Sequence, residues 1–461
     1  MDGGTVRERL RPIVAGRKLV LTGGPLAGLA GLCASVRSLG AERPFLLATG
    51  LGTGPVPGEE DAERFVVEVH ARDAMDDVRR TTDLLGDLPA AATAAVDRWD
   101  PERRALVLNP LFNERTEVAG RAVYGPRRPA WRALEDKVTV DDLWDALGVR
   151  RAPCEVVAAE AGPLRRAAAR LDRGSGTVWA GDAREGFNGG AEYLRWVRSA
   201  GDAAEAATFL AAHCDLARVM PFLEGVPCGI HGLVLPDGVA VLRPVEQVTL
   251  RRPGRNRLLY AGVATFWDPP EADRAAMRSL ARTVGTGLAE RVAYRGAFTI
   301  DGVLTADGFR PTELNPRFGA GLATIGRGLP DLPLYLLHLA LVEGEPLGIG
   351  ARALEALLVE AADGTRSGGA WTLTRAAPVV ASDHGVVFEG GACRFAREGE
   401  QPAGTLSFGP STVGGFVRLS LDPAHVPAGP QVAPFGVAAL TLADHRLGTG
   451  VGPLEPARPV R

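Results

Sequence analysis

The sequence predicts an α/β protein of three parts: an N-terminal α/β domain, a central domain, and a small β-rich C-terminal domain. Apolar runs alternate with a helical pattern near the N-terminus, a long amphipathic helix precedes a strand hairpin in the middle, and short strand-like runs follow. A chain of 461 residues suits about three domains. Segments rich in proline and charge give the predicted limits, which are 1–128, 129–345 and 346–461.

The N-terminal part reads as strand, Gly-rich turn, helix and strand. Lys18–Thr22, Phe45–Thr49 and Leu106–Pro110 are apolar runs of strand length, and a helix of small residues ends near Leu39. The glycines of the turn do not form Gly-x-Gly-x-x-Gly, and no ribose-binding acid follows them. They favour a tight turn with close helix–strand packing over a dinucleotide site. An interpretation of the chain as a dehydrogenase would depend on these glycines alone.

The central part begins with a predicted helix from about Pro129 to Leu147, stopped by Gly148. The alternation from Ile230 to Val241 predicts an antiparallel sheet with Glu246 at its end. A helix over 271–292 has its apolar residues at helical spacing, which indicates core packing. It places the strand hairpin that follows on a sheet.

The C-terminal part follows an apolar helix at Leu332–Val342 and changes character. Strand-like runs separated by Gly and Pro predict a β-rich domain; they are Val386–Phe388, Thr405–Phe408, Gly415–Leu421 and Gly436–Leu442.

Composition narrows the function classes. The net charge of −3 gives no chain-wide basic field for nucleic acid or an anionic membrane. No run approaches the ~18 apolar residues of a spanning helix, and the N-terminus lacks the apolar core of a signal peptide. The five cysteines have no metal-like or redox-like spacing, and the seven histidines are dispersed. We therefore expect a cytoplasmic protein with free thiols and no zinc site.

The most informative segment runs from Thr299 to Gly321 and reads as two short strands around an Asp-Gly turn. If residues 306–308 form a three-residue loop, Gly308 takes the left-handed position and Thr305 pairs with Phe309. Asp301 then lies directly opposite Glu313.

Three oxygen ligands share one face of this hairpin. Glu313 and Asn315 are two residues apart and point to the same side as Asp301, with Arg317 just beyond. This set suits Mg²⁺, which usually takes a few protein oxygens plus substrate phosphates. The alternative is an ordinary surface hairpin with polar residues facing water.

Lysine is rare in this chain, and arginine is abundant. The two lysines are Lys18 and Lys137, and a lysine is a compact point charge that arginine cannot imitate in a tight phosphate site. Lys137 could reach an α- or β-phosphate, or be a solvated surface residue. A basic stretch could lie over phosphates, hold an anionic substrate, or be a solvated loop; it comprises Arg251, Arg252, Arg255 and Arg257.

Two further segments suit a nucleotide cleft. The loop 181–190, with Gly186, Gly189 and Gly190, can bring backbone N–H groups onto phosphate oxygens, although it lacks the Gly-Lys-Ser/Thr ending of a P-loop. A plain hairpin loop is the alternative. The segment 217–225 reads as a strand end turning into a hinge, where Phe222 and Leu223 could pack against an adenine ring.

Together these residues resemble the ATP-grasp superfamily over about 130–345. The resemblance is carried by Asp136-Lys137, Gly186–Gly190, the Met-Pro-Phe-Leu-Glu-Gly hinge at 220–225, and Asp301 with Glu313-x-Asn315-Pro-Arg317. More narrowly, Trp179-Ala-Gly-Asp with Gly186-Phe-Asn-Gly-Gly190 and the β-rich tail look like pheganomycin-type peptide ligases. The N-terminal part looks like the domain that precedes ATP-grasp domains.

The resemblance implies roles for individual residues. The central domain would consist of two α+β lobes, 129–225 and 226–345, with an adenine between them. Mg²⁺ would lie on Asp301, Glu313 and Asn315, and Arg317 would act catalytically on the reacting carboxylate or acyl phosphate. The implied ATP contacts are Lys137, Arg184, Gly186, Asn188, Gly189, Gly190, Met220, Phe222, Leu223 and Glu224. One departure concerns 178–180, where many members have a second lysine and this chain has Val-Trp-Ala. Either Arg184 supplies that charge, or the loop amides and the metal suffice.

The resemblance also implies a reaction. We expect an ADP-forming, ATP-dependent carboxylate–amine ligase that works through an acyl phosphate, in specialised metabolism, with small-molecule or peptide carboxylates and amines as substrates. The alternatives are an ATP-grasp kinase or carboxylase-type enzyme and a catalytically inactive nucleotide-binding module. The sequence leaves open which acid and amine are joined, what the C-terminal domain does, and whether the chain forms a homo-oligomer.

Overall fold

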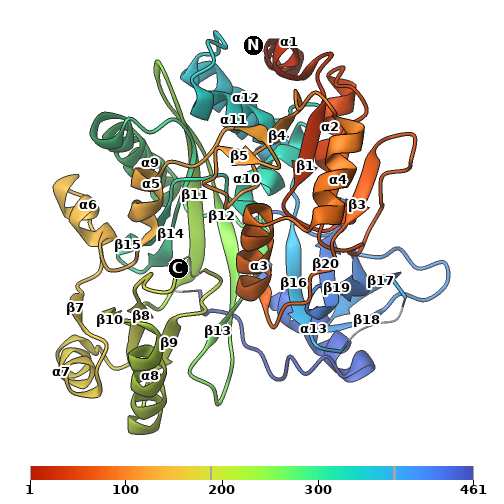
Figure 1. Cartoon of the computed structure of the whole chain (residues 1–461). Coiled ribbons are helices and arrows are strands. Elements are labelled where there is room, and N and C mark those ends of the chain that lie inside the picture. Colours follow the sequence, from red (N-terminus) through yellow and green to blue (C-terminus); the bar gives the residue numbers. More distant parts are fainter. Residues whose placement is uncertain (1, 187–188, 377–379, 460–461) are drawn as a thin grey trace.

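A computed structural model describes residues 2–186, 189–376 and 380–459, arranged around four β-sheets (Figure 1). The first sheet has the strand order β3-β2-β1-β4-β6-β5, and all its pairings are parallel except that of β5 with β6. Its strands are β1 (Leu19–Thr22), β2 (Phe45–Ala48), β3 (Glu63–Val66), β4 (Leu106–Leu108), β5 (Glu117–Val118) and β6 (Arg121–Tyr124). The helices of this part are α1 (Gly3–Val14), α2 (Leu26–Ser38), α3 (Ala74–Gly86) and α4 (Ala90–Trp99).

This N-terminal sheet confirms the α/β pattern predicted from the three apolar runs. β1 and β2 are buried along their whole length, as expected for parallel strands covered on both faces. The Gly-rich turn after β1 has a packing role: Gly23 has φ +107°, and a Cβ there would lie 2.5 Å from Cβ of Pro110.

The second sheet is antiparallel, with the order β7-β10-β8-β9, and two helices pack on it. The elements are β7 (Glu155–Ala158), α7 (Ala161–Leu171), β8 (Thr177–Gly181), β9 (Leu194–Val197), α8 (Ala200–His213) and β10 (Leu216–Pro221). Alternate residues of β10 face opposite sides. Ala217 and Val219 belong to the core beneath the helices, so Arg218 and Met220 face the other way, toward the third sheet.

The helix predicted from Pro129 to Leu147 is broken in the structure. It consists of α5 (Pro129–Arg132), η1 (Ala133–Glu135) and α6 (Val140–Ala146). The carboxylate of Asp136 accepts a hydrogen bond from the N–H of Val138 at 3.0 Å, and Lys137 reaches Glu313 at 3.3 Å. The first contact takes up the N–H of Val138, and the second directs Lys137 to a distant strand, so local and tertiary interactions override the helical pattern here.

The third sheet is antiparallel, with the order β13-β12-β11-β14-β15, and forms the middle of the molecule (Figure 1). Its strands are β11 (Val226–Leu235), β12 (Gly238–Arg251), β13 (Leu258–Ala264), β14 (Gly296–Thr305) and β15 (Gly308–Asn315). The helices of this part are α9 (Glu271–Val292), α10 (Ala320–Ile325), η2 (Gly326–Gly328), α11 (Leu334–Glu343) and α12 (Ala351–Gly364). The helix predicted over 271–292 is confirmed with the same limits.

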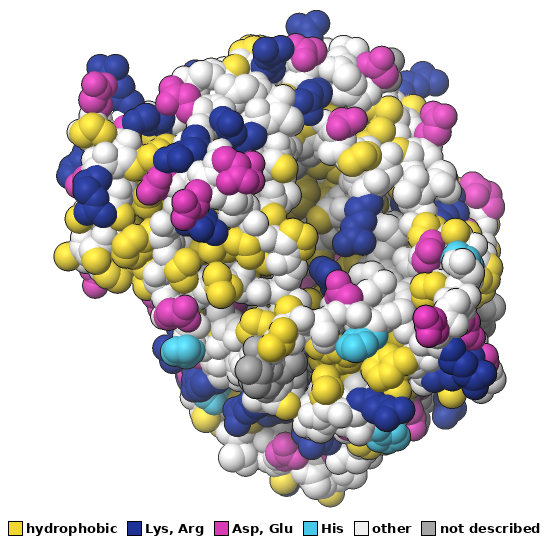
Figure 2. Space-filling view, turned by 90° about the vertical axis from the view of Figure 1, so that its right-hand side faces the viewer, with side chains coloured by type: hydrophobic (Ala, Val, Ile, Leu, Met, Phe, Trp, Pro, Cys, Tyr) yellow, Lys and Arg dark blue, Asp and Glu magenta, His cyan; other side chains and the backbone are white. Residues whose placement is uncertain are grey.

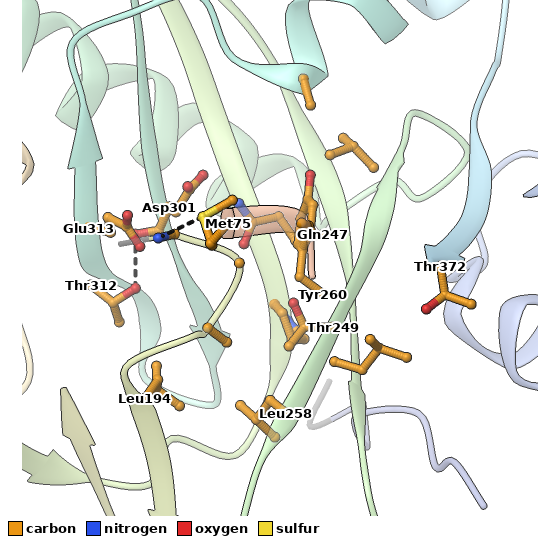
Figure 3. Close-up of a pocket in the computed structure, with 18 of the residues that line it drawn as sticks. Met75, Leu194, Gln247, Thr249, Leu258, Tyr260, Asp301, Thr312, Glu313 and Thr372 are labelled. Atoms are coloured by element: carbon orange, nitrogen blue, oxygen red, sulfur yellow. Dashed lines mark hydrogen bonds between the residues drawn. The ribbon is translucent and has the colours of Figure 1, made fainter. Parts of the chain in front are cut away.

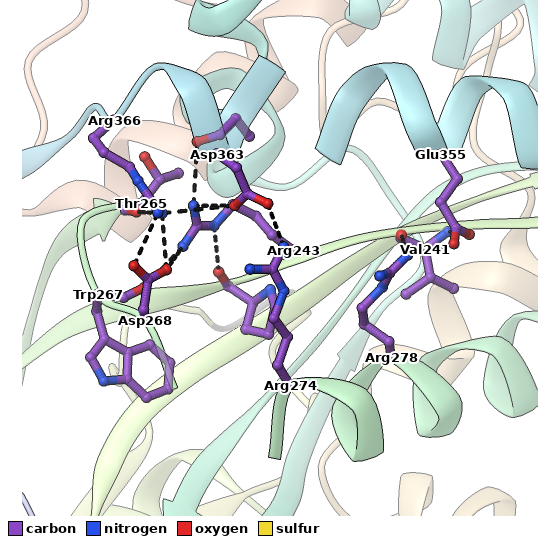
Figure 4. A network of polar contacts seen from close by, with 12 residues as sticks. Val241, Arg243, Thr265, Trp267, Asp268, Arg274, Arg278, Glu355, Asp363 and Arg366 are labelled. Carbon is purple, nitrogen blue, oxygen red and sulfur yellow. Dashed lines mark hydrogen bonds and ion pairs between the residues drawn. The ribbon is translucent and has the colours of Figure 1, made fainter. Parts of the chain in front are cut away.

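A buried arginine ties β12 to two helices (Figure 4). Arg243 is fully buried and pairs with Asp268 at 2.6 Å and Asp363 at 2.7 Å, and Asp363 also pairs with Arg274 of α9 at 2.5 Å. Because removing one partner of a buried ion pair leaves the other charge unpaired, this network holds β12, α9 and α12 in one arrangement.

The fourth sheet confirms the β-rich C-terminal part, with one correction. It is antiparallel, with the order β16-β20-β19-β17-β18, formed by β16 (Gly369–Thr374), β17 (Ser382–Glu389), β18 (Ala392–Phe395), β19 (Gly404–Ser411) and β20 (Gly414–Leu421). The strand predicted at 436–442 is wrong, because these residues lie in helix α13 (Ala433–Leu447). Pro434 in its first turn and Gly448 (φ 60°) after its last residue are typical helix boundaries.

Glu246 joins the third sheet to the C-terminal part. We predicted this residue at the end of the sheet, but it lies inside β12. Its carboxylate accepts hydrogen bonds from the N–H groups of Val432 at 2.5 Å and Ala433 at 2.9 Å. It therefore caps the beginning of α13. Burial raises the pKa of Glu246 to about 7, against the opposing effect of these two hydrogen bonds.

This raised pKa predicts a pH dependence of stability. The folded carboxyl group keeps its proton to a higher pH than the unfolded one, so its stabilising contribution is complete below about pH 4.5 and is lost as the pH rises through about 7. The difference in stability between Glu246→Gln and the native chain should therefore shift in favour of the variant as the pH rises from below 4.5 to above 7. Thermal unfolding of both proteins on the two sides of this range measures the difference, with Glu290→Gln on the exposed side of α9 as control. An equal difference at both pH values would contradict the assignment.

No helix among the described residues is both long and apolar enough to cross a membrane. On the face shown in Figure 2, acidic and basic side chains are interspersed and form no single broad patch.

Candidate functional site

A cavity of about 1090 Å³ lies between the second and third sheets and reaches α3 and the C-terminal sheet. Figure 3 shows Asp301 and Glu313 at one end, Gln247 and Tyr260 in the middle, and Thr372 on the far side. Ten of the predicted site residues line it: Lys137, Gly189, Gly190, Met220, Phe222, Leu223, Asp301, Glu313, Asn315 and Arg317. This volume of about 1090 Å³ is slightly above the roughly 300–1,000 Å³ typical of ligand pockets, so there is room for more than one small molecule.

Three of the other predicted residues do not line this cavity, and one lies outside the described residues. Arg184 and Gly186 line a neighbouring cavity of about 880 Å³ together with Lys137. Glu224 pairs with Arg251 at 2.6 Å. Asn188 is outside the residues that the structure describes.

The hairpin of β14 and β15 brings the two predicted carboxylates together. Asp301 lies directly opposite Glu313, as predicted. The predicted pairing of Thr305 with Phe309 is wrong, because Thr305 pairs with Gly308, whose φ is +96°. A bulge beside Asp301 shifts the register by one residue and restores the predicted partner.

Direct contacts link the residues on this face. The Asn315 amide donates a hydrogen bond to Asp301 Oδ2 at 2.9 Å, and Arg317 donates to Asn315 Oδ1 at 2.8 Å. Lys137 Nζ lies 3.3 Å from Glu313 Oε1. The five side chains therefore form one polar group of two contacting sets, which the pairing of Asp301 with Glu313 brings side by side on the hairpin.

Asp301 is the electrostatic centre of this group. Burial, and then the charge of Glu313, raise the pKa of Asp301 to about 7, while Arg317 and Lys137 act in the opposite direction. Its Oδ1 atom is buried and has no hydrogen-bond partner among the described residues. A buried carboxylate oxygen without a partner is costly, and it is the kind of atom that a cation satisfies.

The space beside Asp301 also suits a ligand. A Cβ added at Gly229, on the next strand, would lie 2.8 Å from Asp301 Oδ1 and 3.6 Å from Gln247 Nε2. Glycine thus keeps a hollow open between these two side chains. Across the described chain, no group of three or more His, Cys, Asp or Glu side chains is arranged to hold a metal. The hairpin offers a different set, two carboxylates and one amide, which fits an oxygen-preferring ion such as Mg²⁺.

Arg317 is held by a buried acid. Glu135 Oε1 lies 3.1 Å from Arg317 Nε and 2.7 Å from Arg127 NH2, and the side chains of Arg127 and Glu135 are almost fully buried. The Arg317 guanidinium also lies 5.0 Å from the centre of the Phe112 ring. The predicted catalytic arginine is therefore fixed at the cavity wall by Glu135 and by Phe112 of the N-terminal part.

Arg218 is a cavity residue that the sequence analysis missed. It lies on β10 opposite Ala180 of β8, at the level where the second lysine is absent. Its guanidinium donates to the carbonyl of Thr312 at 2.6 Å and to Asp141 at 3.2 Å, while its buried Nε has no partner among the described residues. The sequence signal was a single arginine at an inward position of an otherwise apolar strand.

The hinge after β10 offers a flat, mostly apolar wall. Phe222 stacks on Trp196 with ring centroids 4.1 Å apart, and Arg251 lies over the Phe222 ring at 5.0 Å. Met220 and Leu223 extend the same wall. These residues suit a planar heterocycle.

Helix α3 of the N-terminal part contacts the described part of the glycine loop. The N–H of Gly189 donates to the sulfur of Met75 at 3.1 Å, and Arg79 makes a two-bond ion pair with Glu192 at 2.8 and 2.9 Å. Arg184, in contrast, is bound to Asp215 at 3.1 Å. Arg184, the residue that could replace the missing lysine, is thus directed away from the main cavity.

No protein-family model and no curated protein sequence matches the chain, but solved structures do. A biotin carboxylase from Campylobacter jejuni is 12% identical, with TM-score 0.53, over 95% of this chain and 92% of that chain. The biotin carboxylase domain of Hydrogenobacter thermophilus 2-oxoglutarate carboxylase is 13% identical, with TM-score 0.52, over 95% and 91%. Carboxyaminoimidazole ribonucleotide synthase from Aspergillus clavatus is 15% identical, with TM-score 0.51, over 94% and 99%. The fold is that of ATP-grasp proteins, with an N-terminal α/β domain and a C-terminal domain, as predicted.

Proposed function

We propose that this chain is an ATP- and Mg²⁺-dependent ligase that joins a carboxylate to an amine and releases ADP. The observation that carries the proposal is the buried, unpartnered oxygen of Asp301, opposite Glu313 and beside Lys137 and Arg317, in the interlobe cavity of an ATP-grasp fold. The similar structures add support, since they were solved with a nucleotide: an ATP analogue, MgADP with bicarbonate, and ATP.

Each side chain has a task in this reaction. Asp301, Glu313 and Asn315 would hold Mg²⁺, which neutralises charge on the phosphates when bound. The Phe222 wall would bind the adenine. Lys137 and Arg218 face the same cavity from the lobe 129–225. We assign both to the phosphates, with Arg218 in place of the missing lysine. Arg317, held by Glu135, would orient the reacting carboxylate.

The chemistry proceeds in two steps. An oxygen of the substrate carboxylate attacks the γ-phosphorus, the bond to the β-phosphate oxygen breaks, and ADP leaves. The amine nitrogen then attacks the acyl carbon, the bond to the phosphate oxygen breaks, and inorganic phosphate leaves with the amine proton. Preorganised cations around the transferred group supply most of the stabilisation in such a reaction.

Hydroxylamine should trap the acyl phosphate as a hydroxamate. With pooled amino acids and short peptides as carboxylates, we expect ADP and phosphate release that needs both acid and amine, read by a phosphate assay and mass spectrometry. Release of AMP and pyrophosphate would contradict the mechanism.

A carboxylase-type or kinase reaction is the second candidate, because two of the similar structures named above are a biotin carboxylase and a biotin carboxylase domain. It predicts ATP turnover that depends on bicarbonate, or on a phosphate acceptor without any amine. An inactive nucleotide-binding module would bind MgADP and show neither activity.

We further propose that the reaction forms peptide bonds in specialised metabolism, as in the pheganomycin-type ligases that the sequence resembles. The motif around Trp179, the β-rich tail and the size of the cavity support this. Residues 129–345 would carry the nucleotide chemistry, while 1–128 and 346–461 would close the cavity, since Met75 and Trp371 line it. All five cysteines are free, which accords with the cytoplasmic location that we expect from the sequence.

A further inference from the structure

A row of polar atoms without partners crosses the wall of the cavity. Nδ1 of His231, Oγ1 of Thr299 and Oδ1 of Asp301 are all buried, and none has a hydrogen-bond partner within the described ranges. The three residues line the cavity. His231 of β11 pairs in register with Thr299 of β14, and Asp301 is two residues beyond Thr299, so the side chains share one face of the sheet.

Only Asp301 is needed for the metal and the nucleotide. Thr299 and its partner His231 lie two residues further along their strands than Asp301 and Gly229, on the side away from the hairpin turn. Buried polar groups normally find partners, and two adjacent exceptions in a cavity wall indicate a bound molecule that supplies them.

The beginning of α10 holds these two side chains in place. A Cβ at Gly319, the residue before the helix, would lie 2.4 Å from Thr299 Oγ1, and a Cβ at Gly321, inside the helix, would lie 2.2 Å from the His231 ring. The backbone at the beginning of α10 therefore packs closely against both side chains. They are preorganised before any ligand arrives.

The chemistry of the pair suits a neutral nitrogen compound. Burial lowers the pKa of His231 to about 3, so the imidazole is uncharged and has one accepting and one donating nitrogen. Threonine offers a hydroxyl that both accepts and donates. A primary amine, which has N–H donors and a lone pair, can satisfy both groups.

We propose that His231 and Thr299 form the subsite for the amine substrate. The amine donates one N–H to Thr299 Oγ1 and one to His231, with its lone pair directed at the acyl carbon held beside Asp301 and Arg317. Both are positioning residues: the amine proton leaves with the phosphate, as above. The inference rests on the proposed ligase function.

The test measures the amine separately from the nucleotide. Hydroxylamine serves as the amine, pooled amino acids as carboxylates, and hydroxamate formation gives KM for hydroxylamine and for ATP. Thr299→Val, which keeps the volume but loses the hydroxyl, and His231→Leu should each raise KM for hydroxylamine at least tenfold and change KM for ATP less than twofold. Thr299→Ser and His231→Asn, which keep a polar atom near the same place, should recover most of the loss. Thr208→Val, on the exposed side of α8, is the matched control.

Two results would overturn the inference alone: an unchanged KM for hydroxylamine in Thr299→Val and His231→Leu, or an equal rise in KM for ATP. MgADP binding and thermal unfolding of each variant show whether the fold is kept. If the native chain binds MgADP but forms no hydroxamate with any pool, the proposed ligase function itself fails, and the inference fails with it.

Discussion

Glu313→Gln is expected to lower ATP turnover by about 10²–10³-fold, the range seen when one preorganised electrostatic contact to a transition state is removed. Glu313 contributes one of the two carboxylates on the hairpin face, and glutamine keeps the shape while removing the charge. The fold should survive, because the Glu313 side chain is partly exposed and forms an ion pair with Lys137, which itself lies at the cavity wall. Phosphate release with saturating ATP measures the effect.

The matched control is Glu290→Gln, which removes the same charge from an exposed position of α9. Wild-type turnover in Glu313→Gln would show that the carboxylate pair has no part in the chemistry. A fall in both variants would point to a general effect of net charge.

Removing the Arg218 guanidinium is expected to raise KM for ATP by about 10–100-fold. A hydrogen bond to a charged group is worth roughly 1.5–3 kcal/mol, and each factor of ten corresponds to ~1.4 kcal/mol. Arg218→Met alone would leave the buried Asp141 without one of its cations, so the test uses the double variant Arg218→Met/Asp141→Asn.

The single variant Asp141→Asn is the control for this experiment, because it leaves Arg218 and its bond to Thr312 in place. It should keep KM for ATP near the native value. Equal constants in the double variant and the control would mean that Arg218 serves only to join the two lobes.

The sequence correctly predicted the elements that begin and end because of residues close to them in the chain. The helix 271–292 has both its apolar period and its boundaries within its own sequence, beginning directly after Pro270, and it was predicted with the same limits. Asp301 and Glu313 were placed opposite each other although the loop was wrong. A bulge elsewhere in the hairpin cancelled the error of one residue.

Long-range contacts account for what the sequence did not predict. The helix predicted from Pro129 breaks where Lys137 turns toward Glu313, a partner far along the chain. The run at 436–442 fits a strand or a helix equally well, and Glu246 on a distant strand caps the helix it forms. Arg218 and His231 are single residues inside apolar strands, and only the packing of the two sheets shows that they face one cavity.

The central claim is that the hairpin holds a divalent cation beneath a bound nucleotide. Calorimetric titration of ADP into the native chain and into Glu313→Gln, each with and without Mg²⁺, tests it most directly. We predict that Mg²⁺ strengthens ADP binding to the native chain at least tenfold and has little effect on the variant. Binding of equal strength in all four titrations, or no binding to the native chain with Mg²⁺ present, would contradict the claim.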